Sequence, residues 1–452
     1  MIKLHIGLDD TDSPRGGCTT KVAALMIENF RRIDVSFLDY PNLIRLNPNV
    51  PWKTRGNGAV CLRLLCDKGD LDDLKEIAIQ TVEENSDLHY PRTDPGIVFL
   101  TGDVPIEIET FAEMAITGLV RKREAFQLIR RYRAEAVCFN EGRGVIGALA
   151  SIGEQLKKDY TYEFIAYRTP ENVGKPRMID SSSVLLMSKE LGSMSFNNVD
   201  EETGRILITP HGPDPVLYGI RGESPDAVRR GHELVVSYEP IDRWVIFRTN
   251  QGTDAHLRRI GSIVSARPFC PAIIKGEVAS KPRVIAGGHV IFQLKDQTGT
   301  IDCAAYEPTG DLKEKAKMLR VGDIVEVYGG IRKASTCNPL TINLEKINVL
   351  RLAPEVILCN PLCPRCGKRM KSMGRGQGFE CKKCGLHGKR LEKIAEEAKR
   401  SLELGIYVTS PRSQRHLTKP LSRYNLEKCG PPEFLGKPIP IDSFYGVGTS
   451  SG

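Results

Sequence analysis

The hydrophobic and polar positions of the first 255 residues follow two alternating periods. Residues 2–8 (IKLHIGL) alternate apolar with polar or small residues, which predicts a strand, whereas residues 20–30 have the apolar spacing of a helix. Similar strand-like runs occupy 59–66, 160–168, 204–210, 215–222 and 243–250, and helix-like runs occupy 71–84, 107–118, 122–132 and 224–235. This mixture predicts an α/β region at 1–255 with one or two subdomains.

A different pattern begins beyond residue 255. Residues 256–269 fit neither period and are interpreted as a linker, and from 270 to 352 nearly all segments resemble strands joined by glycine turns. The helical exception, DLKEKAKML at 311–319, precedes the fourth of five expected strands. That order is typical of an OB-fold barrel, a common nucleic-acid-binding domain.

Four cysteines are grouped near the C-terminus as two Cys-x-x-Cys pairs, Cys363 with Cys366 and Cys381 with Cys384. This spacing predicts a zinc ribbon at 358–390, and four thiolates leave Zn²⁺ no open position, so the ion is structural. Independent thiols are the alternative. Residues 391–452 are expected to form a basic helix, LEKIAEEAKRSLELG, and then an irregular tail with a frayed end.

The thirteen cysteines otherwise stand mostly alone, and the chain shows neither a signal peptide nor a membrane span. This pattern fits a reducing cytoplasm. The net charge of +8 is unevenly distributed, because residues 361–430 hold 17 Lys and Arg against 6 Asp and Glu. A concentrated positive segment favours a polyanionic partner such as nucleic acid over a plain solvated surface.

Three acidic residues, Asp9, Asp10 and Asp12, lie between the first strand and the first helix, shortly before Thr19 and Thr20. Two carboxylates about 5–6 Å apart repel each other by about 3 kcal/mol at an effective dielectric constant of about 20. A Mg²⁺ ion that also binds phosphate oxygens would relieve this repulsion. The alternative is an Asx-turn whose Ser13 or Thr19 caps the helix.

Other segments must help to hold phosphate, because the chain has no P-loop and no protein-kinase motif pair. Lys53 and Arg55 stand beside a flexible turn, Gly56-Asn57-Gly58, and could bind a polyphosphate, although a plain hairpin turn is the alternative. Gly142 and Gly144 begin a small-residue helix within EGRGVIGALASIGE. This helix either directs its N-terminus at phosphate or packs closely on the sheet.

Four segments together resemble the archaeal tRNA(Ile2) 2-agmatinylcytidine synthetases, the TiaS family. They are GLDDTDSPRGGCTT, NLIRLNPNVPWKTRGNGAV, GRGVIGALASIG and ITPHGPDPVLYGIRGESP, followed by the OB segment and the ribbon in the family's order. The resemblance implies a kinase-like domain joined to a ferredoxin-like domain. It also implies a ligase that cleaves ATP to AMP and phosphate and joins agmatine to the wobble cytidine of the CAU-anticodon isoleucine tRNA.

The resemblance further implies that the cytosine 2-oxo group is activated by phosphorylation and that the enzyme phosphorylates its own threonine, which corresponds to Thr19. Asp9, Asp10 and Asp12 would then bind Mg²⁺, and Lys53 and Arg55 would bind ATP phosphates. Agmatine carries a guanidinium and an amine, so we expect carboxylates in its pocket, with Asp214 and Glu223 as candidates. No membrane and no obligate protein partner are expected.

Two other functions fit parts of the sequence. One is a non-catalytic RNA-binding or single-stranded-DNA-binding protein, since an OB barrel and a zinc ribbon often occur together in such proteins. It leaves the acidic cluster unexplained. The other is an ATP-dependent small-molecule kinase with a regulatory C-terminus, whose turnover would not depend on RNA.

Overall fold

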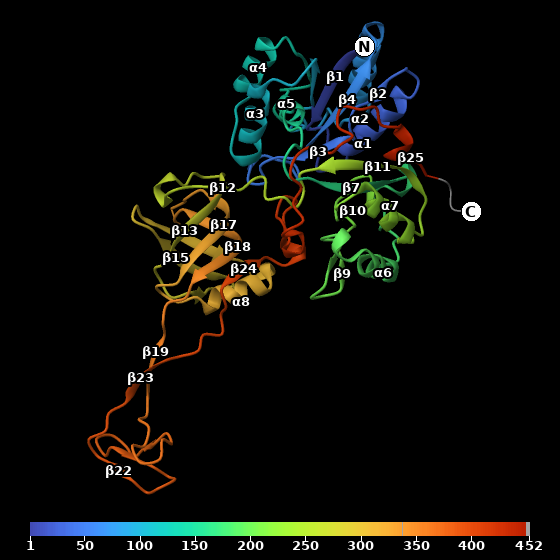
Figure 1. Cartoon of the computed structure of the whole chain (residues 1–452). Coiled ribbons are helices and arrows are strands. Elements are labelled where there is room, and N and C mark those ends of the chain that lie inside the picture. Colours follow the sequence, from blue (N-terminus) through green and yellow to red (C-terminus); the bar gives the residue numbers. More distant parts are fainter. Residues whose placement is uncertain (337, 449–452) are drawn as a thin grey trace.

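The computed structural model describes residues 1–336 and 338–448. An α/β part, an OB barrel and a small ribbon follow one another, and the ribbon projects from the barrel on a two-stranded stem (Figure 1). This architecture confirms the fold class that the sequence pattern predicts. None of the helices described here is both long enough and apolar enough to cross a membrane.

One mixed sheet forms the centre of the α/β part. From edge to edge it contains β10 (Val216–Gly222), β7 (Thr161–Arg168), β11 (Ile241–Thr249), β3 (Asn42–Arg45), β4 (Gly58–Cys66), β1 (Ile2–Asp9), β5 (Gly96–Thr101) and β6 (Glu135–Cys138). The short strand β2 (Ser36–Phe37) pairs with β4. The inner strand β1 is antiparallel to both β4 and β5, and its Leu4, Ile6 and Leu8 are fully buried. The end of β1 is therefore a rigid place from which to present Asp9 and the residues after it.

Helices form at the ranges that the apolar spacing predicts: α1 (Thr19–Phe30), α2 (Leu71–Asn85), α3 (Ile106–Thr117), α4 (Lys122–Arg131), α5 (Val145–Gly153) and α7 (Pro225–Leu234). The helix α6 (Ser181–Leu191) was not expected. Its signal was Asp180, whose carboxylate caps the helix by accepting hydrogen bonds from the backbone of Ser182 and Ser183. The predicted strand 204–210 is reduced to β9 (Arg205–Ile206), which pairs only with β8 (Val199–Asp200).

The glycines around α5 allow this helix to lie unusually close to the sheet. A Cβ atom on Gly7 of β1 would lie 2.0 Å from the carbonyl oxygen of Ala148, and one on Gly96 of β5 would lie 2.1 Å from the backbone nitrogen of Val145. A Cβ on Gly147 would lie 1.9 Å from the Asp9 carboxylate. Close packing is therefore the main reason for the small residues of α5, and it brings the first turn of the helix against Asp9.

The second core is a closed five-stranded barrel. Its strands are β13 (Pro271–Val278), β15 (Val290–Lys295), β16 (Thr300–Ala305), β17 (Ile324–Arg332) and β18 (Thr341–Arg351), with α8 (Asp311–Met318) between β16 and β17. Because β13 pairs with both β17 and β15, the ring closes. The OB-fold prediction is confirmed, including the helix before the fourth strand.

The prediction of a basic helix from residue 391 is wrong. Residues Ile394–Glu397 form β23, which pairs with β19 (Val356–Cys359) as the stem of the ribbon. The segment has good helix formers, but strand pairing satisfies its backbone, and tertiary context overrides such a weak local preference.

The residues after the stem do not form an irregular tail but return to the rest of the molecule. Strand β24 (Gly405–Val408) extends the barrel beside β18, and β25 (Tyr445–Val447) pairs with β11 in the α/β sheet. The red trace in Figure 1 shows this path. The sequence predicts a frayed end at 445–452, but Tyr445–Val447 form β25, and residues 449–452 lie outside the described residues.

Candidate active site and zinc-binding ribbon

A cavity of about 400 Å³ opens where β1 ends and α1 begins. The structure gathers most of the candidate residues in its wall: Asp9, Asp10, Asp12, Thr19, Lys53, Arg55, Gly56, Asn57, Gly58, Gly144 and Asp214. These residues come from segments far apart in the sequence. Gly142 and Glu223 are not part of this wall.

The acidic residues meet two arginines there. The carboxylate of Asp10 accepts a hydrogen bond from Arg143 at 3.0 Å, and that of Asp12 accepts one from Nε of Arg55 at 2.8 Å. Burial raises the pKa of Asp10 to about 6, despite Arg143, and burial together with Asp10 raises the pKa of Asp9 well above its usual range. The site therefore holds negative charge that the protein's own cations compensate only in part.

The acidic residues suit a divalent cation, but the three aspartates are not close enough together to be ligands of one ion at the same time. In the described chain, only the ribbon cysteines bring three or more ligand atoms of Cys, His, Asp or Glu within 4.8 Å of one another. Mg²⁺ usually binds one or two carboxylates and completes its shell with water and phosphate oxygens. The cavity fits that arrangement, with Asp9 and Asp10 as two carboxylates whose pKa burial raises.

The first turn of α1 faces the same cavity through Cys18, Thr19 and Thr20. Thr19 is the first helical residue, Cys18 occupies the N-cap position, and no side chain caps the helix, so the predicted cap by Ser13 or Thr19 does not form. Ser13 instead donates a hydrogen bond to Asp87. An uncapped helix start offers free backbone N–H groups to an anion.

Thr19 itself is held in place but can still be reached. Its hydroxyl accepts a hydrogen bond from the Thr11 hydroxyl at 3.1 Å, and the residue is 6% exposed. The hydroxyl therefore points into a small space between the acidic turn and the helix start. That position is suitable for accepting a phosphoryl group delivered within the cavity.

Arg55 connects the glycine turn to the acidic turn. Besides Asp12, its guanidinium contacts the backbone oxygen of Gly17 at 2.6 Å and the carboxylate of Asp214 at 3.4 Å. Asp214 also pairs with Arg177 at 3.3 Å, and burial raises its pKa. Arg55 and Asp214 thus lie where the sequence analysis expected ligand-binding groups.

The other expected agmatine ligand, Glu223, has a different role. Its carboxylate pairs with Arg423 and, at 2.7 Å, with Lys428, both from the returning C-terminal segment. Arg423 also pairs with Asp159 at 3.0 Å. The structure therefore places Glu223 in a buried anchor and not in the ligand cavity.

Several cavity residues escaped the sequence analysis, among them Arg143, Glu163 and His416. Glu163 on β7 is 4% exposed and contacts Arg45 at 3.6 Å and Arg221 at 3.3 Å. The available signal was a single acid in a strand run whose other charged residue is the terminal Arg168. His416 comes from the returning segment, and its Nδ1 lies 3.0 Å from Oε1 of Gln251. Nothing in the local sequence connects His416 to a site formed by residues 9–58.

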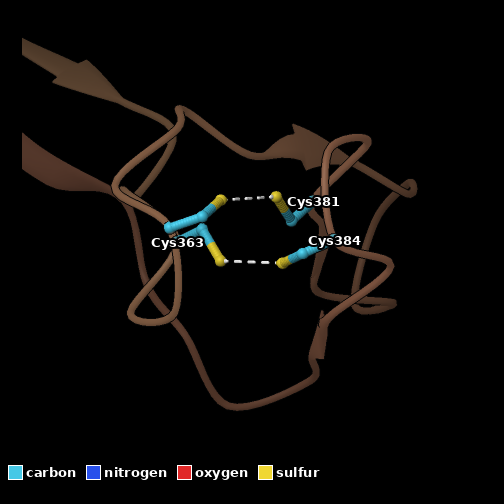
Figure 2. Close-up of side chains that lie close together, drawn as sticks. Cys363, Cys381 and Cys384 are labelled. Carbon is cyan, nitrogen blue, oxygen red and sulfur yellow. Dashed lines mark hydrogen bonds between the residues drawn. The ribbon is translucent and has the colours of Figure 1, made fainter.

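The ribbon brings its four cysteines together as the spacing predicts. The Sγ atoms of Cys363 and Cys384 are 3.5 Å apart, and those of Cys366 and Cys381 are 3.4 Å apart (Figure 2). All four sulfurs lie within 4.8 Å of one another. Along the chain, Cys363 and Cys366 precede β20 (Lys371–Ser372), and Cys381 and Cys384 lie between β21 (Phe379–Glu380) and β22 (His387–Gly388). Four thiolates suit tetrahedral Zn²⁺ and leave no position for substrate.

The substitution Cys381→Ser should remove zinc from the protein. The ribbon core contains little besides its cysteines, Met370 and Phe379, so the metal supplies much of its folding energy. Native mass spectrometry should show one zinc in the wild type and none in the variant. Equal zinc content in the exposed-cysteine control, Cys429→Ser, and in Cys381→Ser would contradict the assignment.

Comparisons with known proteins agree with this organisation. Family models match the TiaS TCKD domain at residues 5–72, the TiaS FLD domain at 142–256, the OB-fold nucleic acid binding domain at 272–350 and the TiaS C-terminal zinc ribbon domain at 360–402. The tRNA(Ile2) 2-agmatinylcytidine synthetase TiaS of Staphylothermus marinus is 44% identical over 95% of each chain.

Solved structures extend the similarity to the whole fold. A crystal structure of apo TiaS, tRNAIle2 agmatidine synthetase, has a TM-score of 0.84 at 41% identity and covers 93% of this chain and 97% of that one. A TiaS–tRNA(Ile2)–AMPCPP–agmatine complex has a TM-score of 0.81 at 38% identity and covers 94% and 98%. The chain belongs to the TiaS family of tRNA(Ile2) 2-agmatinylcytidine synthetases. This membership confirms the resemblance seen in the motifs.

Proposed function

We propose that this protein is the ATP-dependent ligase that joins agmatine to the wobble cytidine of the CAU-anticodon isoleucine tRNA. The observation that carries the proposal is the cavity in which Asp9, Asp10, Asp12 and Thr19 meet Arg55 at the start of α1. A related structure contains tRNA(Ile2), the ATP analogue AMPCPP and agmatine. A binding protein without catalysis would have no use for this acidic cavity.

The cavity's own groups are arranged to hold a polyphosphate. The start of α1, with its free backbone N–H groups, and the guanidinium of Arg55 line the cavity, and so does the turn Gly56-Asn57-Gly58. Asp9 and Asp10, with Asp12 held by Arg55, supply the carboxylates for Mg²⁺, which would neutralise charge on the transferred phosphoryl group. Lys53 adds a further cation.

Phosphorylation makes the cytosine 2-oxo oxygen a good leaving group. The oxygen attacks the terminal phosphorus of ATP, and ADP departs as its bond to that phosphorus breaks. The agmatine amine then attacks C2 and loses a proton, and the C2–O bond breaks as phosphate departs. Cleavage of ATP to AMP releases two phosphoryl groups, and the cavity offers two acceptors, the flipped base and the Thr19 hydroxyl. Phosphorylation of Thr19 by the enzyme itself fits this count.

The agmatine cation needs carboxylates near the reacting base. Asp214 lines the cavity. Glu163, another carboxylate in the cavity wall, replaces Glu223 as the second candidate for binding agmatine. Both carboxylates already contact arginines, so they are oriented before a ligand arrives. Desolvated carboxylates of this kind suit a guanidinium or an ammonium group.

The barrel and the ribbon provide surfaces for the remainder of the tRNA. Ten of the 17 basic residues between 361 and 430 lie in the ribbon and its stem, at 361–393. A surface so rich in cations binds a phosphate backbone and releases counterions. A tRNA substrate and the free thiols of the described cysteines support a cytoplasmic location.

Incorporation of labelled agmatine into defined tRNA transcripts tests the proposal. The CAU-anticodon isoleucine transcript should accept label only when ATP is present, and a matched transcript with uridine at the wobble position should accept none. Tight tRNA binding without incorporation would instead support a binding protein. ATP turnover that ignores RNA would support a small-molecule kinase.

A further inference from the structure

A second cavity of about 280 Å³ adjoins the catalytic one, and we call it the cationic chamber. One wall comes from the segment 45–56 and the other from the returning segment 414–417. Its basic residues are Arg45, Lys53, Arg55, Arg415 and His416, and its remaining residues are Leu46, Pro48, Gly56, Gln414 and Leu417. Not one of these lining residues is acidic.

Several N–H donors around the chamber have no acceptor. Within the described chain, Nε of Arg45 and Nδ2 of Asn49 are buried and make no hydrogen bond. Nη1 of Arg55 makes no hydrogen bond either, but it lies 3.4 Å from the Asp214 carboxylate. Lys53 has no ion pair or side-chain hydrogen bond to any described residue. Buried donors are nearly always paired in folded proteins, so this group of unpaired donors indicates a missing acceptor.

The charges in the chamber repel one another. Burial, followed by the charge of Arg415, lowers the pKa of Lys53. Burial and then Arg45, Arg221 and Lys53 lower the pKa of His416 well below its usual range. An anion in the chamber would relieve both effects.

The chamber lies at the junction between the α/β part, the barrel and the returning segment. Arg415 bonds to Asn49 of the α/β part and lies 3.8 Å from Glu345 of the barrel strand β18. Asn49 in turn lies against Gly330 of β17, where a Cβ would be 2.3 Å from its side-chain oxygen. A nucleic-acid strand passing from the barrel to the catalytic cavity would cross this junction.

The chamber and the catalytic cavity share part of their lining, and the passage between them is narrow at Gly56. A Cβ atom on Gly56 would lie 2.8 Å from Nη1 of Arg45 and 3.1 Å from Nε2 of His416. Arg45, Lys53, Arg55, Gly56 and His416 line both spaces. A group bound in the chamber would therefore be continuous with a ligand in the catalytic cavity.

We propose that the cationic chamber binds a phosphate group next to the catalytic cavity, and that residues 414–417 form its outer wall. The proposal rests on the function proposed above and adds a subsite that the N-terminal motifs alone do not form. Two phosphates of the reaction could occupy it. One belongs to the triphosphate of ATP, and the other is the phosphodiester beside the wobble nucleotide.

The variant Lys53→Met tests the chamber, because it removes one unpaired cation and keeps the length of the side chain. KM should be measured for ATP at saturating tRNA and for tRNA at saturating ATP. We expect a rise of about tenfold in one of them, since a charge-assisted hydrogen bond is lost. A higher KM for ATP assigns the chamber to the triphosphate. A higher KM for tRNA assigns it to the phosphodiester, and the slope of log tRNA affinity against log salt concentration should then be smaller by about 0.7.

Two controls accompany this variant. Lys53→Arg keeps the charge and should restore KM to near its original value. Lys437→Met removes an exposed cation outside the chamber and should change neither KM.

Values of both KM within twofold of wild type in Lys53→Met would overturn the proposal. That outcome is distinct from failure of the proposed function, in which the wild-type protein itself would not attach agmatine to tRNA.

Discussion

Substitution of Asp10 by asparagine should lower the kcat of agmatine incorporation about a thousandfold. The change keeps the shape of the side chain but removes the charge at the turn after β1, where the backbone of Asp10 has a φ of 62°. Phosphoryl transfer depends mostly on positioning and charge compensation, and loss of one such group typically costs about 10²–10³ in rate. Single-turnover assays with saturating ATP and tRNA measure the effect directly.

The same variant should remain as stable as the wild type. Because burial raises the pKa of Asp10 to about 6, its ionised form at neutral pH is a cost to the folded state, and a neutral amide removes that cost. Asp103→Asn, which alters an exposed acid paired with Lys3, is the matched control and should keep full activity. Asp10→Asn activity within tenfold of wild type would contradict the role given to this carboxylate.

The second large effect is expected at Arg423, whose side chain is 1% exposed. It pairs with Asp159 and Glu223 and donates to the backbone oxygen of Gly252, so it fastens the returning segment to the α/β part. Arg423→Met should loosen that segment, because two carboxylates lose their main partner. Breaking a buried ion pair in this way costs about 3–5 kcal/mol.

Hydrogen exchange at β25 can measure this cost. Its pairing with β11 depends on the segment staying in place, so amide protection there should fall at least about a hundredfold. The double variant Arg423→Met/Glu223→Gln removes one of the stranded charges and should recover part of the loss. Unchanged protection in Arg423→Met would show that the anchor does not hold the segment.

Local sequence patterns were sufficient for most of the fold. The alternation in β1, the spacing in α1 and the glycine turns of the barrel are set by which face is buried, and that information lies within a few residues. The stem strand β23 is one of the exceptions, because its helix-forming residues pair with β19 about 40 residues earlier in the chain. A pairing over that distance has no local signal.

The same distinction between local and long-range signals applies to the candidate site. Asp9, Asp10, Asp12 and Thr19 belong to one strand–turn–helix unit, so their meeting could be predicted. Glu163 and His416 reach the cavity through the sheet and the C-terminal return. Glu223 is a candidate from the sequence because agmatine needs carboxylates, but its partners in the structure, Arg423 and Lys428, lie about 200 residues further along the chain.

The central claim is that ATP activates the wobble cytosine by phosphorylation in this cavity. A tRNA carrying ¹⁸O at the C2 oxygen of the wobble cytidine tests it most directly, because the bond that breaks decides where the label goes. The account predicts that one ¹⁸O atom appears in inorganic phosphate for each agmatine attached. Label found in AMP would mean that the base is adenylated instead, and label released as water would mean that C2 is never activated by phosphate; either result would contradict the account.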